Sequence, residues 1–74
     1  MKLVCNNRRI ISVQSLKEAS EVFQKFIERG QYLSSELAVN AGNVIVGERL
    51  IATVSYNGRV WTPDDYPHSA EIII

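Results

Sequence analysis

Apolar and polar side chains follow two different periods along this chain, and the two periods separate one helix from several strands. Between residues 16 and 27, apolar positions recur every three or four residues, which is the spacing of one helical face. The members of this face are Leu16, Ala19, Val22, Phe23, Phe26 and Ile27. Ser15 and Glu18 form a capping box before the run, and Arg29 suits the negative end of a helix dipole. We therefore predict a helix from Ser15 to Arg29, with Phe23 and Phe26 packed on a sheet.

The strongest strand signal is the pair Asn57-Gly58, which lies between two runs of β-prone residues. An Asn-Gly pair in that setting predicts a two-residue type I′ hairpin turn. Such a turn would place Val54 opposite Trp61 and sort the side chains onto two faces. The face predicted to be core carries Leu50, Ala52, Val54, Tyr56, Arg59 and Trp61, and the other carries Ile51, Thr53, Ser55, Val60 and Thr62. Trp61 would then contribute the largest buried area.

Shorter β-prone runs complete the pattern. Residues 8–13 predict a strand, which is either preceded by a hairpin partner at residues 2–5 or part of one bent strand. Residues 44–46, 49–56 and 59–62 predict three more strands, and residues 69–74 predict a short terminal one. The resulting order is β(β)αβββ, an α+β fold in which one α-helix packs on an antiparallel β-sheet of about four strands. Residues 1–74 are expected to form a single domain.

The composition is that of a small globular protein. The chain has 74 residues, of which 46% are hydrophobic and 22% charged, so disorder is not expected, but the core is near the size at which dimerisation would add needed stability. The single cysteine, Cys5, cannot form an internal disulfide, and no signal peptide or membrane-spanning run is visible, which predicts a cytoplasmic protein. The formal net charge is zero, although residues 1–31 hold six basic and three acidic residues and the remainder two basic and five acidic.

The residue types needed for catalysis or metal binding occur without a recognised spacing. Asp64, Asp65 and His68 lack the ligand spacing of zinc or calcium sites, and nothing in the sequence places Cys5 or a serine beside His68. The glycines mark turns rather than a phosphate-binding loop. We expect a protein that is not an enzyme and that uses no cofactor or metal.

Binding to a larger protein is the function that these residues favour, because turn tips and surface loops are where binding residues concentrate. The predicted contact residues are Tyr56, Asn57 and Arg59 at the hairpin tip and Asp64 and Asp65 in the following acidic loop. The acidic pair is equally typical of a solvated turn. One alternative is a small nucleic-acid-binding module that uses Arg8, Arg9 and Arg59, with Tyr56 and Trp61 as stacking aromatics; zero net charge argues against it. Another is a structural homodimer joined along Ile72-Ile73-Ile74.

Two longer segments carry a resemblance. Ser15-Leu16-Lys17-Glu18-Ala19-Ser20 and Ser55-Tyr56-Asn57-Gly58-Arg59-Val60-Trp61 resemble a group of small bacterial and prophage proteins that share a helix beginning SLxEAS and a hairpin reading SYNGRVW. In size and plan the chain is also similar to several anti-CRISPR proteins of phages and mobile elements, which bind a Cas effector complex without catalysis. The resemblance implies a phage or mobile-element accessory protein that acts in the host cytoplasm by occluding a basic Cas surface.

Overall fold

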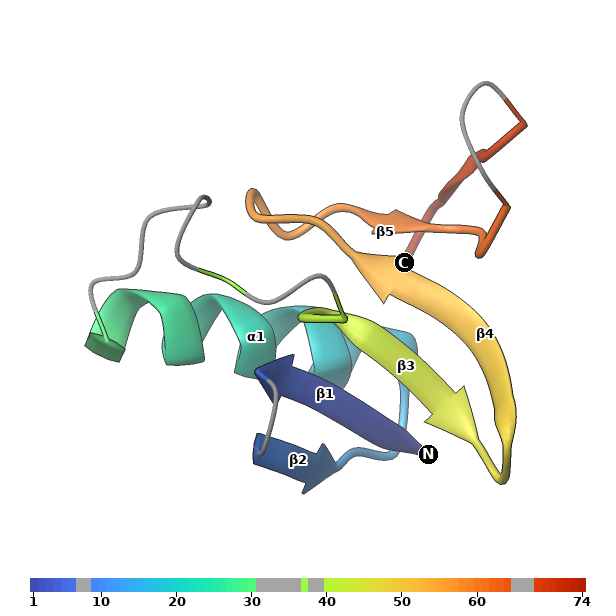
Figure 1. Cartoon of the computed structure of the whole chain (residues 1–74). Helices are drawn as coiled ribbons and strands as arrows, with labels where there is room; N and C mark the ends of the chain where they lie inside the picture. Colours follow the sequence, from blue (N-terminus) through green and yellow to red (C-terminus); the bar gives the residue numbers. More distant parts are fainter. Residues whose placement is uncertain (7–8, 31–36, 38–39, 65–67) are drawn as a thin grey trace.

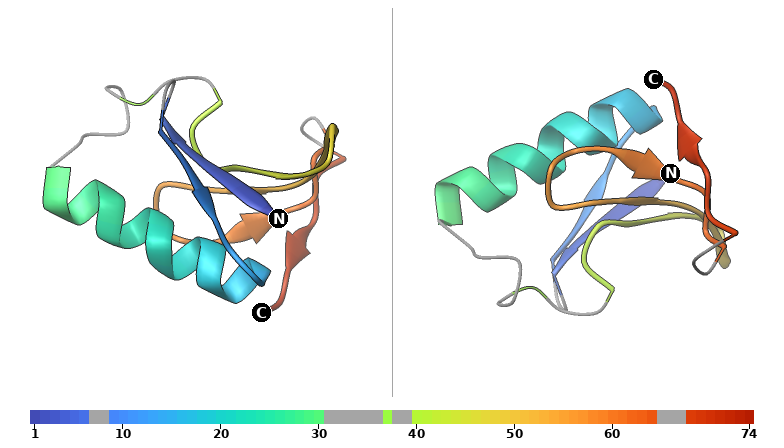
Figure 2. Two further views of the ribbon diagram at one scale, coloured as in Figure 1. Left: turned by 90° about the horizontal axis from the view of Figure 1, so that it is seen from below. Right: turned by 90° about the horizontal axis from the view of Figure 1, so that it is seen from above.

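In the described part of the chain, one antiparallel sheet has a single helix lying across one face (Figure 1). The computed structural model describes residues 1–6, 9–30, 37, 40–64 and 68–74. Its elements are β1 (Lys2–Asn6), β2 (Arg9–Ser12), α1 (Leu16–Gly30), β3 (Asn43–Val46), β4 (Arg49–Val54), β5 (Val60–Trp61) and β6 (Glu71–Ile72). The views from below and above show α1 on one side of the sheet only (Figure 2). The predicted α+β class is confirmed.

The sheet has six strands rather than about four, in the spatial order β2-β1-β3-β4-β5-β6, and every neighbouring pair is antiparallel. The two alternatives for the N-terminal residues are decided by the pairing of β1 with β2, which makes them a hairpin. The short terminal strand predicted in residues 69–74 is β6. The two edge strands are therefore β2 and β6.

The predicted helix is confirmed, and so is its N-terminal cap. The backbone N–H of Glu18 donates to the Ser15 hydroxyl oxygen over 3.0 Å, which satisfies one of the amides that a helix start leaves unpaired. Phe23 is 1% exposed and forms part of the core, as expected. Phe26 is only half-buried, and its ring stacks on that of Phe23 with the ring centroids 6.4 Å apart.

The hairpin register differs from the prediction by one residue. Val54 pairs with Val60, and Thr53 pairs with Trp61. The Gly58 N–H donates to the Ser55 carbonyl over 2.9 Å, the Ser55 N–H donates to the Arg59 carbonyl over 2.8 Å, and Gly58 has a φ of 87°. These bonds define a three-residue loop with a glycine bulge rather than a two-residue type I′ turn.

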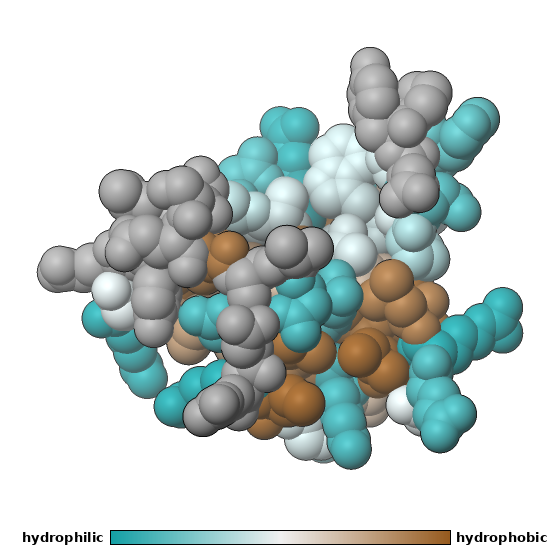
Figure 3. Space-filling view, viewed as in Figure 1, coloured by the Kyte–Doolittle hydropathy of each residue, from teal (hydrophilic) through white to brown (hydrophobic). Residues whose placement is uncertain are grey.

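A one-residue slip exchanges the two faces of a strand, so the predicted core face is wrong for β5. Val60 is 1% exposed and faces α1 with Val54, whereas Trp61 is half-buried on the opposite face. A second irregularity in β4 leaves Ile51 between the residues that pair with Val44 and Ile45, which turns Leu50 away from the core. Leu50 is 38% exposed on the face opposite α1, where apolar side chains gather among charged ones (Figure 3).

The core lies between α1 and the facing side of the sheet. Its fully buried side chains with the largest volumes are Phe23, Leu3, Val44, Val60 and Cys5. Together they join the helix to β1, β3 and β5, so the core spans the inner strands of the sheet.

Candidate functional site

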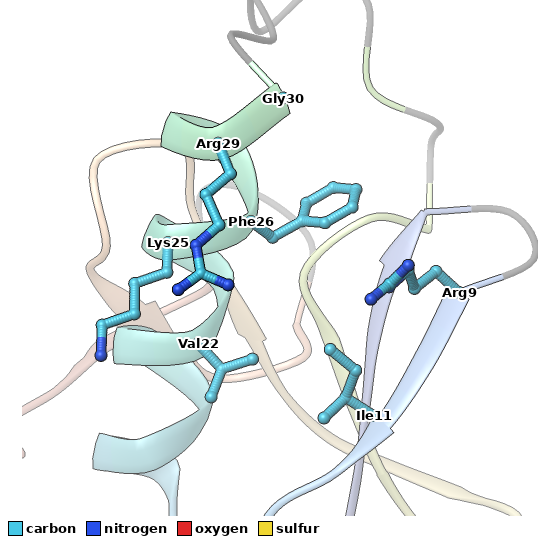
Figure 4. Close-up of a pocket in the computed structure, with 7 residues that line it drawn as sticks. All are labelled: Arg9, Ile11, Val22, Lys25, Phe26, Arg29 and Gly30. Carbon is cyan, nitrogen blue, oxygen red and sulfur yellow. The ribbon is translucent and has the colours of Figure 1, made fainter.

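A groove of about 390 Å³ lies between the edge strand β2 and the C-terminal half of α1 (Figure 4). It is lined by Arg9, Ile11, Val22, Lys25, Phe26, Arg29 and Gly30. Figure 4 shows Arg9 on the strand side of the groove and Arg29 near Lys25 on the helix side, while the Phe26 ring projects from the helix toward the strands and Ile11 faces Val22. Apolar side chains therefore lie between cationic groups that come from both the strand and the helix.

Simple periodicity explains why these residues meet. Arg9 and Ile11 are two positions apart in β2, so both side chains lie on the face of the sheet that carries α1. On the helix, Val22, Phe26 and Arg29 are three or four positions apart and therefore share one flank beside the buried stripe. The groove forms where this flank faces an edge strand.

The electrostatics of the groove are cationic. Arg9, Lys25 and Arg29 are exposed, and none of them forms an ion pair with another residue that the structure describes. Guanidinium groups remain charged at all ordinary pH values and present donors in a fork that suits a carboxylate or a phosphate. An anionic group in the groove would meet positive charge from both the strand and the helix.

Cys5 lies behind this site and is fully buried. Burial raises the pKa of the Cys5 thiol, and the nearby positive charge of Arg9 lowers it by a smaller amount. A raised pKa keeps the thiol protonated at neutral pH, whereas thiol nucleophiles act as thiolates. Cys5 is therefore a core residue.

The predicted contact residues at the hairpin tip lie on a different surface. The tip is fixed to α1 by the Ser20 hydroxyl, which donates to the Gly58 carbonyl over 2.6 Å, and the Gln24 side-chain amide donates to the same hydroxyl oxygen over 3.2 Å. The side chain of Asn57 accepts from the Ser55 hydroxyl. Tyr56, at 45% exposed, and Arg59 lie exposed at this tip, and their role as contact residues stays a prediction.

The acidic loop does not join the tip. Asp64 is exposed, but it follows β5 and lies at the end opposite the hairpin turn, as both Figure 1 and Figure 2 show for this segment. Asp65 and Arg8 lie outside the described residues. The proposed nucleic-acid set is also dispersed, because β1, β3 and β4 separate Arg9 in β2 from Arg59 beside β5.

Comparison with protein-family models, curated proteins and solved structures finds no significant match. Within the described part of the chain, no group of three or more His, Cys, Asp or Glu side chains is placed to hold a metal ion. The helix that the structure describes is not long and apolar enough to cross a membrane.

The sequence reasoning missed Lys25, which it assigned to the polar face of the helix, and Arg29, which it assigned to the negative end of the helix dipole. The excess of basic residues in positions 1–31 was the available signal, because Arg9, Lys25 and Arg29 all come from that segment. Joining them requires knowing that β2 lies beside α1.

Proposed function

We propose that this protein acts by stoichiometric binding to another protein, without catalysis. The observation that carries the proposal is the groove between β2 and α1, where cationic groups that form no ion pair with any described residue border apolar side chains. Concave sites with apolar lining and a few convergent polar groups are typical of binding sites. Buried, protonated Cys5 supports the non-catalytic part of the proposal because the thiol does not reach solvent.

The most specific form of this proposal is an anti-CRISPR inhibitor, carried by a phage or mobile element, that occupies a surface of a Cas effector complex. Its support is the resemblance in size and in the plan of one helix on an antiparallel sheet. The hairpin tip with Tyr56, Asn57 and Arg59 would be a second contact surface, since a turn held to the helix by Ser20 presents its side chains in a fixed arrangement. Asp64 would contribute separately, from the other end of β5.

Affinity capture from a nuclease-treated host lysate tests this function. The tagged protein is compared with Arg9→Glu/Arg29→Glu in the groove, with Tyr56→Ala/Arg59→Ala at the tip and with Asp64→Lys, after circular dichroism has shown that each variant is folded. We expect a protein partner that the wild type recovers in stoichiometric amount and the groove variant loses. Cas subunits in that fraction would support the specific form, and recovery of no protein by the wild type would refute the binding function.

A nucleic-acid-binding module is the second candidate, because Arg9, Lys25 and Arg29 gather at one place. Phosphate contacts of this kind make affinity fall steeply with salt, roughly with the number of phosphates neutralised. A gel shift of single-stranded and double-stranded oligonucleotides between low and physiological salt separates the two candidates, since the protein-binding function predicts no shift in either.

A further inference from the structure

Strand β2 presents an open edge beside the groove. It is the terminal strand of the sheet, and among the described residues it pairs with β1 alone. Met1 and Val13 exchange both backbone hydrogen bonds, at 2.9 and 3.2 Å, just beyond the β1–β2 ladder. In an antiparallel pair, bonded and non-bonded residue pairs alternate, so Leu3–Ile11 is bonded, whereas Ile10 and Ser12 direct their N–H and C=O groups away from β1.

The open edge and the groove have the geometry for one additional strand. Ile10 and Ser12 are both exposed residues, and their outward backbone groups pair with no described strand. A strand paired with β2 would direct every second side chain toward α1, and these side chains would be about 6.6 Å apart. That spacing matches the groove-lining residues of β2, because Arg9 and Ile11 are themselves two positions apart on the same face.

We propose that the groove binds an extended segment of a partner protein, which adds to the sheet along β2 and carries an acidic residue and an apolar residue separated by one position. This inference rests on the proposed protein-binding function and specifies its partner. The acidic side chain lies between Arg9 and Arg29, and the apolar side chain packs on Ile11 and Val22 beside Phe26. Backbone hydrogen bonds to Ile10 and Ser12 give affinity, and the two side chains give specificity.

Two competing effects bear on the binding of an acidic side chain. The C-terminus of α1, at Gly30, carries partial negative charge that weakly opposes an anion at an exposed site. Hydrogen bonds between ionised groups are stronger than this effect. Arg9 comes from the strand and Arg29 from the helix, so an acid held by both gains more than the helix terminus costs.

The apolar lining residues and the edge of β2 favour a peptide over a nucleic acid. A phosphate backbone would use the arginines but neither the edge N–H and C=O groups nor Ile11 and Val22. A zero net charge also withholds the long-range attraction on which nucleic-acid binding depends.

Two fluorescein-labelled octapeptides probe the site, Gly-Ser-Thr-Glu-Thr-Val-Thr-Gly and Gly-Ser-Thr-Val-Thr-Glu-Thr-Gly, because the strand can run in either direction. Titrations at low salt are followed by fluorescence polarisation and by amide shifts in ¹⁵N-labelled protein. We expect one order to bind and to shift the amides of Ile10 and Ser12. A Gln-for-Glu peptide and a backbone N-methylated peptide should each bind at least about tenfold more weakly, the change that 1.4 kcal/mol produces.

Protein variants locate the contact. Arg9→Glu/Arg29→Glu should weaken the better peptide by at least about tenfold, a loss of 1.4 kcal/mol or more. Arg49→Glu is the matched control, because Arg49 is an exposed arginine on β4 that does not line the groove. The affinity of this variant for the peptide should stay within about twofold of the wild type, or about 0.4 kcal/mol.

Several results would overturn the inference. The first is that the N-methylated peptide or the Gln peptide binds as tightly as the Glu peptide, and the second is that neither octapeptide binds. The third is that oligo(dT) displaces the bound peptide. The fourth is that light scattering shows a dimer of the wild type which the groove variant does not form. The last would assign the groove to a second copy of this chain. If both peptides fail while lysate capture still depends on Arg9 and Arg29, the peptide class is wrong and the proposed function stands.

Discussion

Three glycines with left-handed backbone form a series that tests the packing of this fold. Gly42, Gly47 and Gly58 have φ values of 88°, 62° and 87°, so an alanine at any of them takes a conformation that L-residues rarely adopt. Their surroundings differ. A Cβ at Gly47 would meet nothing within 4 Å, one at Gly58 would meet the flexible amide of Gln24, and one at Gly42 would overlap the Val54 carbonyl oxygen.

The cost of each substitution follows from these surroundings. Left-handed backbone costs an L-residue about 1–2 kcal/mol, and the smaller entropy of the unfolded chain returns about 0.4–1 kcal/mol. Gly47→Ala should therefore destabilise the protein by about 0–1.6 kcal/mol. At Gly42 the overlap lies far inside 3.0 Å, so the backbone must move.

Movement at Gly42 would weaken two short backbone hydrogen bonds. The Gly42 N–H donates to the Val4 carbonyl over 2.7 Å, and the Gly42 carbonyl accepts from the Val54 N–H over 2.8 Å. Each buried group left unpaired costs about 1–3 kcal/mol. Gly42→Ala should therefore cost at least about 3 kcal/mol. Because a domain of this size has only about 4–11 kcal/mol of stability, this variant loses much of it.

Urea unfolding, followed by Trp61 fluorescence and far-ultraviolet circular dichroism, measures all three variants against the wild type. The expected order of destabilisation is Gly47→Ala, then Gly58→Ala, then Gly42→Ala. The double variant Gly58→Ala/Gln24→Ala should be less destabilised than the sum of its single changes, since removing the Gln24 amide relieves the contact. If Gly42→Ala and Gly47→Ala lower the free energy of unfolding by amounts that agree within about 0.5 kcal/mol, the close approach of Gly42 to β4 is refuted.

Two further predictions concern the buried polar and thiol groups. Ser20→Ala removes the donor to the Gly58 carbonyl and should lower the free energy of unfolding in urea by about 1–2 kcal/mol. Gln24→Ala should lower it by less than about 0.5 kcal/mol. Equal losses in the two variants would contradict a structural role for the Ser20 hydrogen bond. Burial raises the pKa of the Cys5 thiol, so the unfolded chain loses this proton at a lower pH than the folded protein does. The resulting stability is fully present below the unfolded thiol pKa. Above that pKa the free energy of unfolding falls by up to about 1.4 kcal/mol per pH unit until the folded pKa is reached. Cys5→Ala should remove that part of the slope above about pH 8.5, and an unchanged slope would refute it.

Local signals in the sequence predicted the elements well. The cap at Ser15 and the stripe through Phe23 act within one or two turns of helix, and both are as expected. The Asn57-Gly58 pair predicted a hairpin at the right place but in the wrong register. Turn propensity favours a two-residue loop, while the three-residue loop lets Val60 join Val54 under α1 and brings the Gly58 carbonyl to Ser20. The tertiary contacts decided the register.

The groove could not be predicted from local signals, because its parts come from separate segments. Arg9 and Arg29 are 20 positions apart, and each side chain alone is typical of a solvated surface. The helix periodicity correctly assigned Lys25 to the polar side, but it gave no information on what lies beside that side. The neighbour of α1 depends on the order β2-β1-β3, which is a property of the whole sheet.

The two edge strands of the described sheet, β2 and β6, differ in what they can bind. Pairing β2 of one molecule with β6 of another would be a head-to-tail contact, but β6 contains only two residues. The few hydrogen bonds that it could form contribute about 0.5–1.5 kcal/mol each, which does not offset an association cost of about 4–15 kcal/mol. β2 contains four residues and borders the groove, so a strand there adds side-chain contacts with Arg9 and Ile11 to its backbone bonds. An extended segment that fills the groove therefore gains more at β2 than the short β6 edge of a second copy.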